Sequence, residues 1–173
     1  PVTIDGDGTV IYADTSKEWY NYCDKRWANA VILEEGANYK AGDIISEADI
    51  QSYFVWIPKY KYKLWNVDTP VETAHEIDIV FDENDTTDVE GIACKTPMLS
   101  GESGNCSNGE YMTHPAFISM GVNGFWVGKF ETGYKGATST AGAQVNANDT
   151  SKIIIKPNIY SWRSINVYNA FLN

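Results

Sequence analysis

The strongest constraint on the fold is the two-residue period of the segment from Tyr53 to Trp65. One parity consists of Phe54, Trp56, Pro58, Tyr60, Tyr62 and Leu64, and the other of Tyr53, Val55, Ile57, Lys59, Lys61 and Lys63. Successive side chains of a strand point to opposite faces, so this period predicts a long β-strand whose second half has an apolar and a basic face. Pro58 has no N–H to donate to a ladder, which predicts a sheet edge or a bulge at that position.

A hairpin turn is predicted near the start of the chain. Asp5-Gly6-Asp7-Gly8 lies between two short apolar runs, which is typical of a tight turn between antiparallel strands. The same residues could open a calcium loop, but the twelfth position of such a loop requires Glu, and Ser16 stands there. The turn is therefore the favoured interpretation.

The sequence also predicts several short strands and two short helices. Strands are expected at Trp27–Leu33, His75–Phe81 and Lys152–Lys156, and short helices after Ser46 and from Ser164 to Leu172. In the second strand His75, Ile77, Ile79 and Phe81 are expected to face inward, and Glu76 and Asp78 outward. In the last helix the expected apolar stripe consists of Ile165, Tyr168, Phe171 and Leu172.

Composition excludes some classes of protein. The chain has 173 residues with a formal net charge of −10, and contains 11 Tyr and 6 Trp. Binding to nucleic acid requires clustered Lys and Arg, so a nucleic-acid ligand is not expected. No apolar run is long enough for a transmembrane helix. The aromatic residues suit strands, interfaces and sugar-binding faces, and for any single one a place in the core is favoured.

Cysteine spacing predicts one disulfide. Cys94 and Cys106 flank a Gly- and Ser-rich loop, and a bridge between them would contribute about 3 kcal/mol by the chain-entropy model. The alternative is two unpaired thiols in a cytosolic protein. Cys23 would then be a buried or free thiol, and no Cys/His cluster has zinc spacing, so neither a metal nor another cofactor is expected.

A long loop is expected from Asp82 to Tyr111. Its first part is acidic and contains Asp82, Asn84, Asp85, Asp88 and Glu90. Such oxygen ligands could hold calcium, but their spacing matches no known loop, so a solvated acidic loop is favoured. A second flexible loop is expected from Tyr134 to Asp149, which is rich in small and polar residues.

The segment from His114 to Thr132 resembles a known family. His114-Pro115-Ala116, Gly124–Thr132, Ser161-Trp162 and Asn169-Ala170-Phe171 look like the N-terminal half of the formylglycine-generating-enzyme-like (sulfatase-modifying factor) family. That resemblance implies an α+β, β-rich, C-type-lectin-like fold with long irregular loops. It covers about sixty residues of the 173.

A second resemblance extends over nearly the whole chain. Trp27–Leu33, Tyr53–Tyr60, the Cys94/Cys106 loop and His114–Phe117 together look like surface proteins of gut Firmicutes. Those proteins often carry a type IV pilin-like segment ahead of this region, and related domains occur in phage tail tips. The resemblance implies export and display on the bacterial cell surface.

These resemblances set the expected domain organisation. Residues 1–173 are expected to form a single β-rich domain or a domain fragment, with an N-terminal β segment at 1–45 and a lectin-like region at 46–173. The enzyme family's cysteine pair and its "R-L-P-T-E-A-E-W-E" helix have no counterpart here, which suggests only the N-terminal part of the full domain. None of the three cysteines stands in a matching position, so an enzyme is not expected.

The sequence therefore predicts a non-enzymatic, extracellular ligand-binding or adhesion module. Its ligand would be a glycan or a protein on a host or neighbouring cell, with Tyr111 and Tyr134 as candidate binding residues. Two alternatives stay open: a structural or tip subunit that self-assembles into a pilus-like filament, and a phage or prophage receptor-binding protein. In all three, Trp126 and Phe130 are expected to pack inward, and Glu131 to fix a loop.

Overall fold

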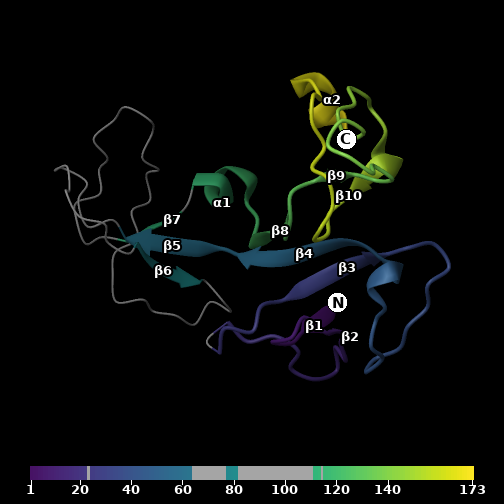
Figure 1. Cartoon of the computed structure of the whole chain (residues 1–173). Coiled ribbons are helices and arrows are strands. Elements are labelled where there is room, and N and C mark those ends of the chain that lie inside the picture. Colours follow the sequence, from purple (N-terminus) through teal and green to yellow (C-terminus); the bar gives the residue numbers. More distant parts are fainter. Residues whose placement is uncertain (23, 64–76, 82–110, 114) are drawn as a thin grey trace, which may run out of the picture. The chain divides into compact units, whose positions relative to one another are not determined.

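The protein is β-rich, with antiparallel sheets and few helices (Figure 1). A computed structural model describes residues 1–22, 24–63, 77–81, 111–113 and 115–173. The β-rich class predicted from the alternating sequence is confirmed. Cys23, the Cys94/Cys106 pair, the acidic loop and His114 lie outside the described residues, so the predictions made for them stay predictions.

The chain divides into two compact units. Unit 1 contains residues 1–56 and 126–173, and unit 2 contains residues 57–125. The division falls within the alternating segment, between Trp56 and Ile57. Each unit is described by itself below.

A five-stranded sheet has the strand order β2-β1-β3-β4-β8. Its strands are β1 (Val2–Ile4), β2 (Val10–Tyr12), β3 (Asn29–Leu33), β4 (Ile50–Pro58) and β8 (Gly124–Gly128). The predicted hairpin turn joins β1 to β2. The backbone N–H of Thr9 donates to Asp5 Oδ1 at 2.8 Å and to Asp7 Oδ1 at 2.9 Å, which holds the turn closed.

One face of this sheet carries the core of unit 1. Val2, Val10, Ile45, Ile50 and Tyr53 are buried together, with partly buried Val31 and Leu33 packed against them. Complete burial of an aliphatic side chain of this size contributes about 1.5–3 kcal/mol each. The expected short helix after Ser46 is the single 3₁₀ turn η1 (Glu47–Asp49), in which Ser46 Oγ accepts from the N–H of Ala48.

The pairing of β3 with β4 assigns side chains to the two faces. Val31 lies opposite Tyr53, and Ala30 lies opposite Phe54. Because paired residues share a face, Val31 and Tyr53 belong to the core side and Ala30 and Phe54 to the other side. The register shifts by a bulge at Ile32/Leu33, which brings Ile50 back to the core side.

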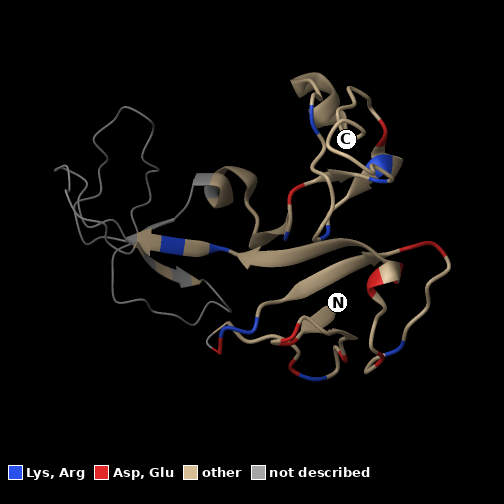
Figure 2. Cartoon of the chain, viewed as in Figure 1, with Lys and Arg blue, Asp and Glu red and all other residues tan. Residues whose placement is uncertain are grey.

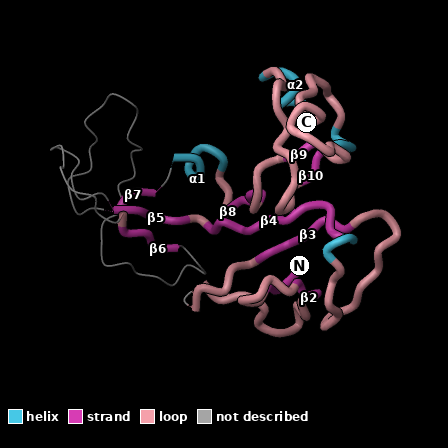
Figure 3. The backbone as a smooth tube through the Cα atoms, viewed as in Figure 1, coloured by secondary structure: helices cyan, strands magenta, loops and turns pink. Residues whose placement is uncertain are grey.

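The C-terminal part of unit 1 consists mostly of loops (Figure 3). Its regular elements are β9 (Gly133–Tyr134), the 3₁₀ turn η2 (Thr150–Lys152), β10 (Ile153–Ile154) and α2 (Val167–Leu172). The prediction that Ser164 caps the last helix is wrong. Ser164 has a φ of 57°, whereas a cap needs extended backbone, and Asn166 takes that role by accepting from the N–H of Asn169 at 2.8 Å.

Unit 2 has a three-stranded sheet and one helix. Its elements are β5 (Tyr60–Lys63), β6 (Asp78–Phe81), β7 (Tyr111–Thr113) and α1 (Pro115–Met120), with the strand order β6-β5-β7. Phe117 is buried against the rings of Tyr60 and Phe125, at 5.3 and 5.4 Å between centroids. The prediction that Ile77 and Ile79 face inward is wrong, because both side chains are 51% exposed.

We predict that Gly133→Ala destabilises unit 1. A Cβ at this buried position would lie 2.1 Å from Ile159 Cδ1 and 3.1 Å from the carbonyl oxygen of Tyr160. The expected loss is about 1–3 kcal/mol in the free energy of unfolding, measured by urea denaturation, because overpacking forces neighbouring atoms to move. Gly6→Ala is the control, since nothing lies within 4 Å of its added Cβ. Equal stability of the two variants would contradict the packing described.

We also predict that Tyr53 makes stability fall in strongly alkaline solution. Burial, and next the hydrogen bond that its hydroxyl donates to Glu47, raise the pKa of Tyr53 above its ordinary value of 10.0. The stabilisation that Tyr53 contributes is complete below pH 10, where the hydroxyl keeps its proton in both the folded and the unfolded state. It is lost as pH rises, because only the unfolded state then ionises. One such group changes the free energy of unfolding by at most about 1.4 kcal/mol per pH unit.

The comparison that checks this prediction is urea unfolding of the native chain and of Tyr53→Phe at pH 9, 10 and 11. The variant has a lower stability at pH 9, because the bond to Glu47 is gone, but a shallower decline above pH 10. Parallel declines in the two proteins would contradict the assignment.

Candidate functional site

The face of the unit 1 sheet opposite the core is rich in aromatic side chains. We call it the aromatic face; its residues are Trp19, Tyr20, Ala28, Ala30, Ile32, Phe54, Trp56 and Trp126. Ala30 and Phe54 are directly paired, which places them together on this side. Trp56 is joined to the residue that precedes β3, because its backbone N–H donates to the carbonyl of Ala28 at 2.9 Å.

Two open apolar hollows lie on the aromatic face. One, of about 290 Å³, is lined by Ala30, Ile32, Phe54 and Trp126, together with Val31, whose side chain packs against the core. The other, of about 250 Å³, is lined by Trp19, Tyr20, Ala28, Trp56 and Trp126. The two hollows share Trp126. Ala28 and Ala30 carry only methyl groups, so β3 forms a low floor between taller aromatic walls.

The shared wall, Trp126, is held by an aromatic contact. Its ring packs edge to face against Trp56, with centroids 5.4 Å apart and planes at 62°. Edge-to-face pairs of this kind contribute about 0.5–1.5 kcal/mol beyond buried area. Even so, 47% of Trp126 stays exposed. The prediction that it packs inward is therefore wrong, and so is the same prediction for Phe130, which is 39% exposed although its ring contacts Tyr53.

The loop before β3 supplies the outer wall of the second hollow. Rings of Trp19, Tyr20, Tyr22 and Trp27 touch in series, with centroid distances of 4.9, 5.7 and 5.2 Å. Tyr22 is buried, and its hydroxyl donates to the carbonyl of Trp56 at 2.9 Å. This bond ties the loop to β4, so Trp19 and Tyr20 stand at a fixed place beside Trp56.

The aromatic face carries no charge. None of the side chains that line the two hollows is ionisable at neutral pH, and Figure 2 shows the charged residues of unit 1 on other segments than β3 and β4. Arg26, in the loop that carries the aromatic series, is paired with Glu18 and with Asp24 at 3.6 Å. The hollows therefore suit an uncharged ligand surface.

The polar atoms of the lining are mainly hydrogen-bond donors. In the described part of the chain, the indole N–H groups of Trp19, Trp56 and Trp126 donate to no protein acceptor, and neither does the hydroxyl of Tyr20. Trp162 differs, because its indole N–H donates to the carbonyl of Val145 at 2.6 Å. An indole can donate but cannot accept. Three indole donors among the lining residues are therefore left unused by the described part of the fold.

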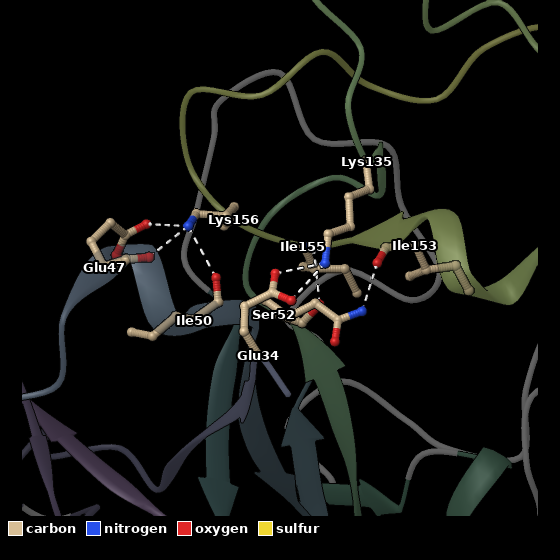
Figure 4. Close-up of polar contacts among 9 residues, drawn as sticks. Glu34, Glu47, Ile50, Ser52, Lys135, Ile153, Ile155 and Lys156 are labelled. Carbon is tan, nitrogen blue, oxygen red and sulfur yellow. Dashed lines mark hydrogen bonds and ion pairs between the residues drawn. The ribbon is translucent and has the colours of Figure 1, made fainter. Parts of the chain in front are cut away.

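Polar contacts join the C-terminal part of unit 1 to β3 and β4 (Figure 4). Lys156 Nζ donates to the carbonyls of Glu47 and Ile50 at 2.7 and 3.0 Å, and Lys135 Nζ contacts both carboxylate oxygens of Glu34 at 2.6 and 2.7 Å. At the centre, the N–H of Ile155 donates to Ser52 Oγ at 3.1 Å. These contacts attach the C-terminal loops of unit 1 to residues in and beside β3 and β4.

A lysine and an amide form a second polar contact beside the core. Lys129 Nζ donates to Oδ1 of buried Asn29 at 2.9 Å, and Asn29 Nδ2 donates to the carbonyl of Trp27 at 2.8 Å. Partial burial lowers the pKa of Lys129 below its ordinary value. The contact joins residues a hundred positions apart, and it fixes the start of β3 relative to the end of the β8 segment.

The residues singled out from sequence have different surroundings. Tyr134 lies in β9, half-buried, and its ring packs against Trp162 with centroids 5.0 Å apart. The backbone of Tyr111 lies in β7 of unit 2. Glu131 accepts a hydrogen bond from Ser161 Oγ at 2.6 Å, which joins two loops as expected. Binding roles for Tyr111 and Tyr134 stay predictions.

Comparisons with protein-family models, with curated proteins and with solved structures find no match to this chain. The family resemblances noted in the sequence therefore stay predictions. Within the described residues no group of three or more His, Cys, Asp and Glu could hold a metal ion. The helices of the described part are also too short or too polar to cross a membrane.

We predict that Tyr22→Phe weakens the wall of the second hollow. It removes the hydrogen bond to the carbonyl of Trp56, at an expected cost of about 1 kcal/mol in the free energy of unfolding measured in urea. Tyr20→Phe is the matched control, because that hydroxyl donates to no acceptor in the described part of the chain. It should change stability by less than about 0.5 kcal/mol. A loss of the same size in both variants would contradict the anchoring role of Tyr22.

Proposed function

We propose that this chain is a non-enzymatic, extracellular ligand-binding module displayed on a bacterial surface, where it serves adhesion. The observation that carries the proposal is the aromatic face, with its two open hollows on either side of Trp126. We propose further that the β-rich fold is C-type-lectin-like, which rests on the resemblance in the segment from His114 to Thr132.

The physical argument for a ligand concerns exposed apolar area. Monomeric proteins rarely leave large contiguous apolar patches in water, and patches of that kind commonly mark interaction sites. Here Trp126 and Ile32 are each about half exposed on one uncharged face, and Tyr20 adds a further exposed ring. Aromatic side chains lose little entropy on binding and dominate the energetic centre of many interfaces. The face is therefore suited to bind rather than only to pack.

The proposal of a non-enzymatic role is supported by the cysteines of the sequence and by the surroundings of Lys129. The cysteine pair of the enzyme family that the chain resembles has no counterpart among Cys23, Cys94 and Cys106. Lys129, whose pKa is lowered, has its amine directed to the amide of Asn29 instead of into either hollow. These observations favour recognition over covalent chemistry.

One observation favours a second candidate, a subunit that self-assembles into a surface filament. Helix α2 exposes an apolar stripe, in which Val167 and Phe171 are each 87% exposed. A self-complementary or head-to-tail contact through such a stripe would join copies of the chain. Concentration-dependent sedimentation that Phe171→Ala abolishes would favour this candidate over the adhesion module.

Trp126→Ala tests the adhesion module. The purified chain should bind immobilised mucin or matrix protein above background. The variant should bind at least about 30-fold more weakly, because a central aromatic anchor typically contributes 2 kcal/mol or more. Biolayer interferometry measures both constants.

Phe171→Ala is the matched control for this experiment, since it removes another exposed aromatic ring from α2 rather than from the aromatic face. It should bind as the native chain does. Equal losses in the two variants, or no binding by the folded native chain, would count against the proposal.

A further inference from the structure

We propose that the aromatic face binds a proline-rich segment in the extended polyproline II conformation, one prolyl stretch lying across both hollows. This inference rests on the proposed function and names the chemical class of its ligand. It follows from three properties of the lining: the balance of donors and acceptors, the spacing of the hollows and the absence of charge.

Donor and acceptor balance decides between ligand classes. The side chains of the lining offer three indole N–H donors, and the Tyr20 hydroxyl is their one group that can also accept. A sugar brings many hydroxyl protons that need acceptors, and the side chains of this lining provide almost none. A run of prolines has carbonyl acceptors and no N–H groups, so its hydrogen-bonding needs match the lining.

The shape of the face fits the same ligand. A polyproline II helix repeats every three residues and rises about 9 Å per turn. Ala28 and Ala30, the floors of the two hollows, are same-face neighbours in the β3 region and lie about 7 Å apart along the chain. Rings two or three residues apart are separated by about 6 to 9 Å along this helix, a range that includes the spacing of the two alanines, so such rings could enter the two hollows with Trp126 between them. Docking on aromatic-lined grooves is a recurring mode of proline-rich recognition.

Charge supports this choice. The lining is neutral, and Arg26 of the adjoining loop is already paired with Glu18 and Asp24. The chain as a whole carries a net charge of −10, which disfavours approach of anionic glycans and polyphosphates. A prolyl stretch is neutral, and it also enters the complex already extended, which lowers the entropic cost of binding.

The test uses two synthetic decapeptides and the full chain. Isothermal titration should show binding of L-decaproline, whereas D-decaproline, which has the same composition but forms the mirror-image helix, should bind at least tenfold more weakly. Trp126→Phe, which keeps a ring but removes the donor, should weaken L-decaproline binding about fivefold. Phe171→Ala should leave it unchanged.

Equal binding of the two enantiomers, or no binding of L-decaproline to the native chain, would overturn the inference. Cellohexaose is titrated in parallel as a neutral sugar chain. If cellohexaose or mucin binds in a Trp126-dependent manner while L-decaproline does not, the inference fails and the proposed adhesion function stands. If the folded native chain binds neither L-decaproline nor cellohexaose, mucin or matrix protein, both fail.

Discussion

The structure of unit 1 depends on the two-residue alternation of strand β4. The strand has β3 on one side and β8 on the other, and its side chains alternate between the core side and the aromatic face. Tyr53 packs into the core with Val2 and Ile50, while Phe54 and Trp56 point to the opposite side. A one-residue slip would exchange the two faces, so the buried core that fixes the register also determines which aromatic residues of β4 lie on the opposite face.

Two anchoring systems keep this arrangement in place. The contact of Ile155 with Ser52, together with the Lys156 and Lys135 contacts, attaches the C-terminal loops to β3 and β4. The bond from Tyr22 to the carbonyl of Trp56 attaches the aromatic loop on the other side. Both systems contact β4, and the second holds the aromatic loop that forms the outer wall of the second hollow. Rigid walls are what a binding face built on exposed rings requires.

Most strands could be predicted from the sequence, but which face of each strand is buried could not. Alternation and an Asp-Gly turn are local signals, and they located β3, the β1–β2 hairpin and the β4–β5 segment. Whether a face is covered depends on distant residues. Trp126, Phe130 and Ile79 have the chemistry of core residues, yet no described element covers them fully. The last helix was predicted too long because the positive φ of Ser164 has no signature in its residue type.

The candidate site was missed for the same reason. Its residues come from a loop, two paired strands and the β8 segment, and none forms a motif in sequence. One usable signal was present: Ala28 and Ala30 alternate in step with Phe54 and Trp56, and small residues beside large ones leave hollows where no described element covers the sheet. Tyr111 and Tyr134 were favoured instead because they lie near glycine-rich loops, and Tyr134 packs on Trp162.

The central claim is that the sheet of unit 1 has one buried face and one open aromatic face. Attenuation of tryptophan indole N–H signals by a soluble gadolinium chelate in a ¹⁵N-correlated NMR spectrum tests it most directly. The account predicts strong attenuation for Trp126, and a preserved signal for Trp162, whose indole N–H is bonded to Val145. A Trp126 signal as well protected as that of Trp162 would contradict it.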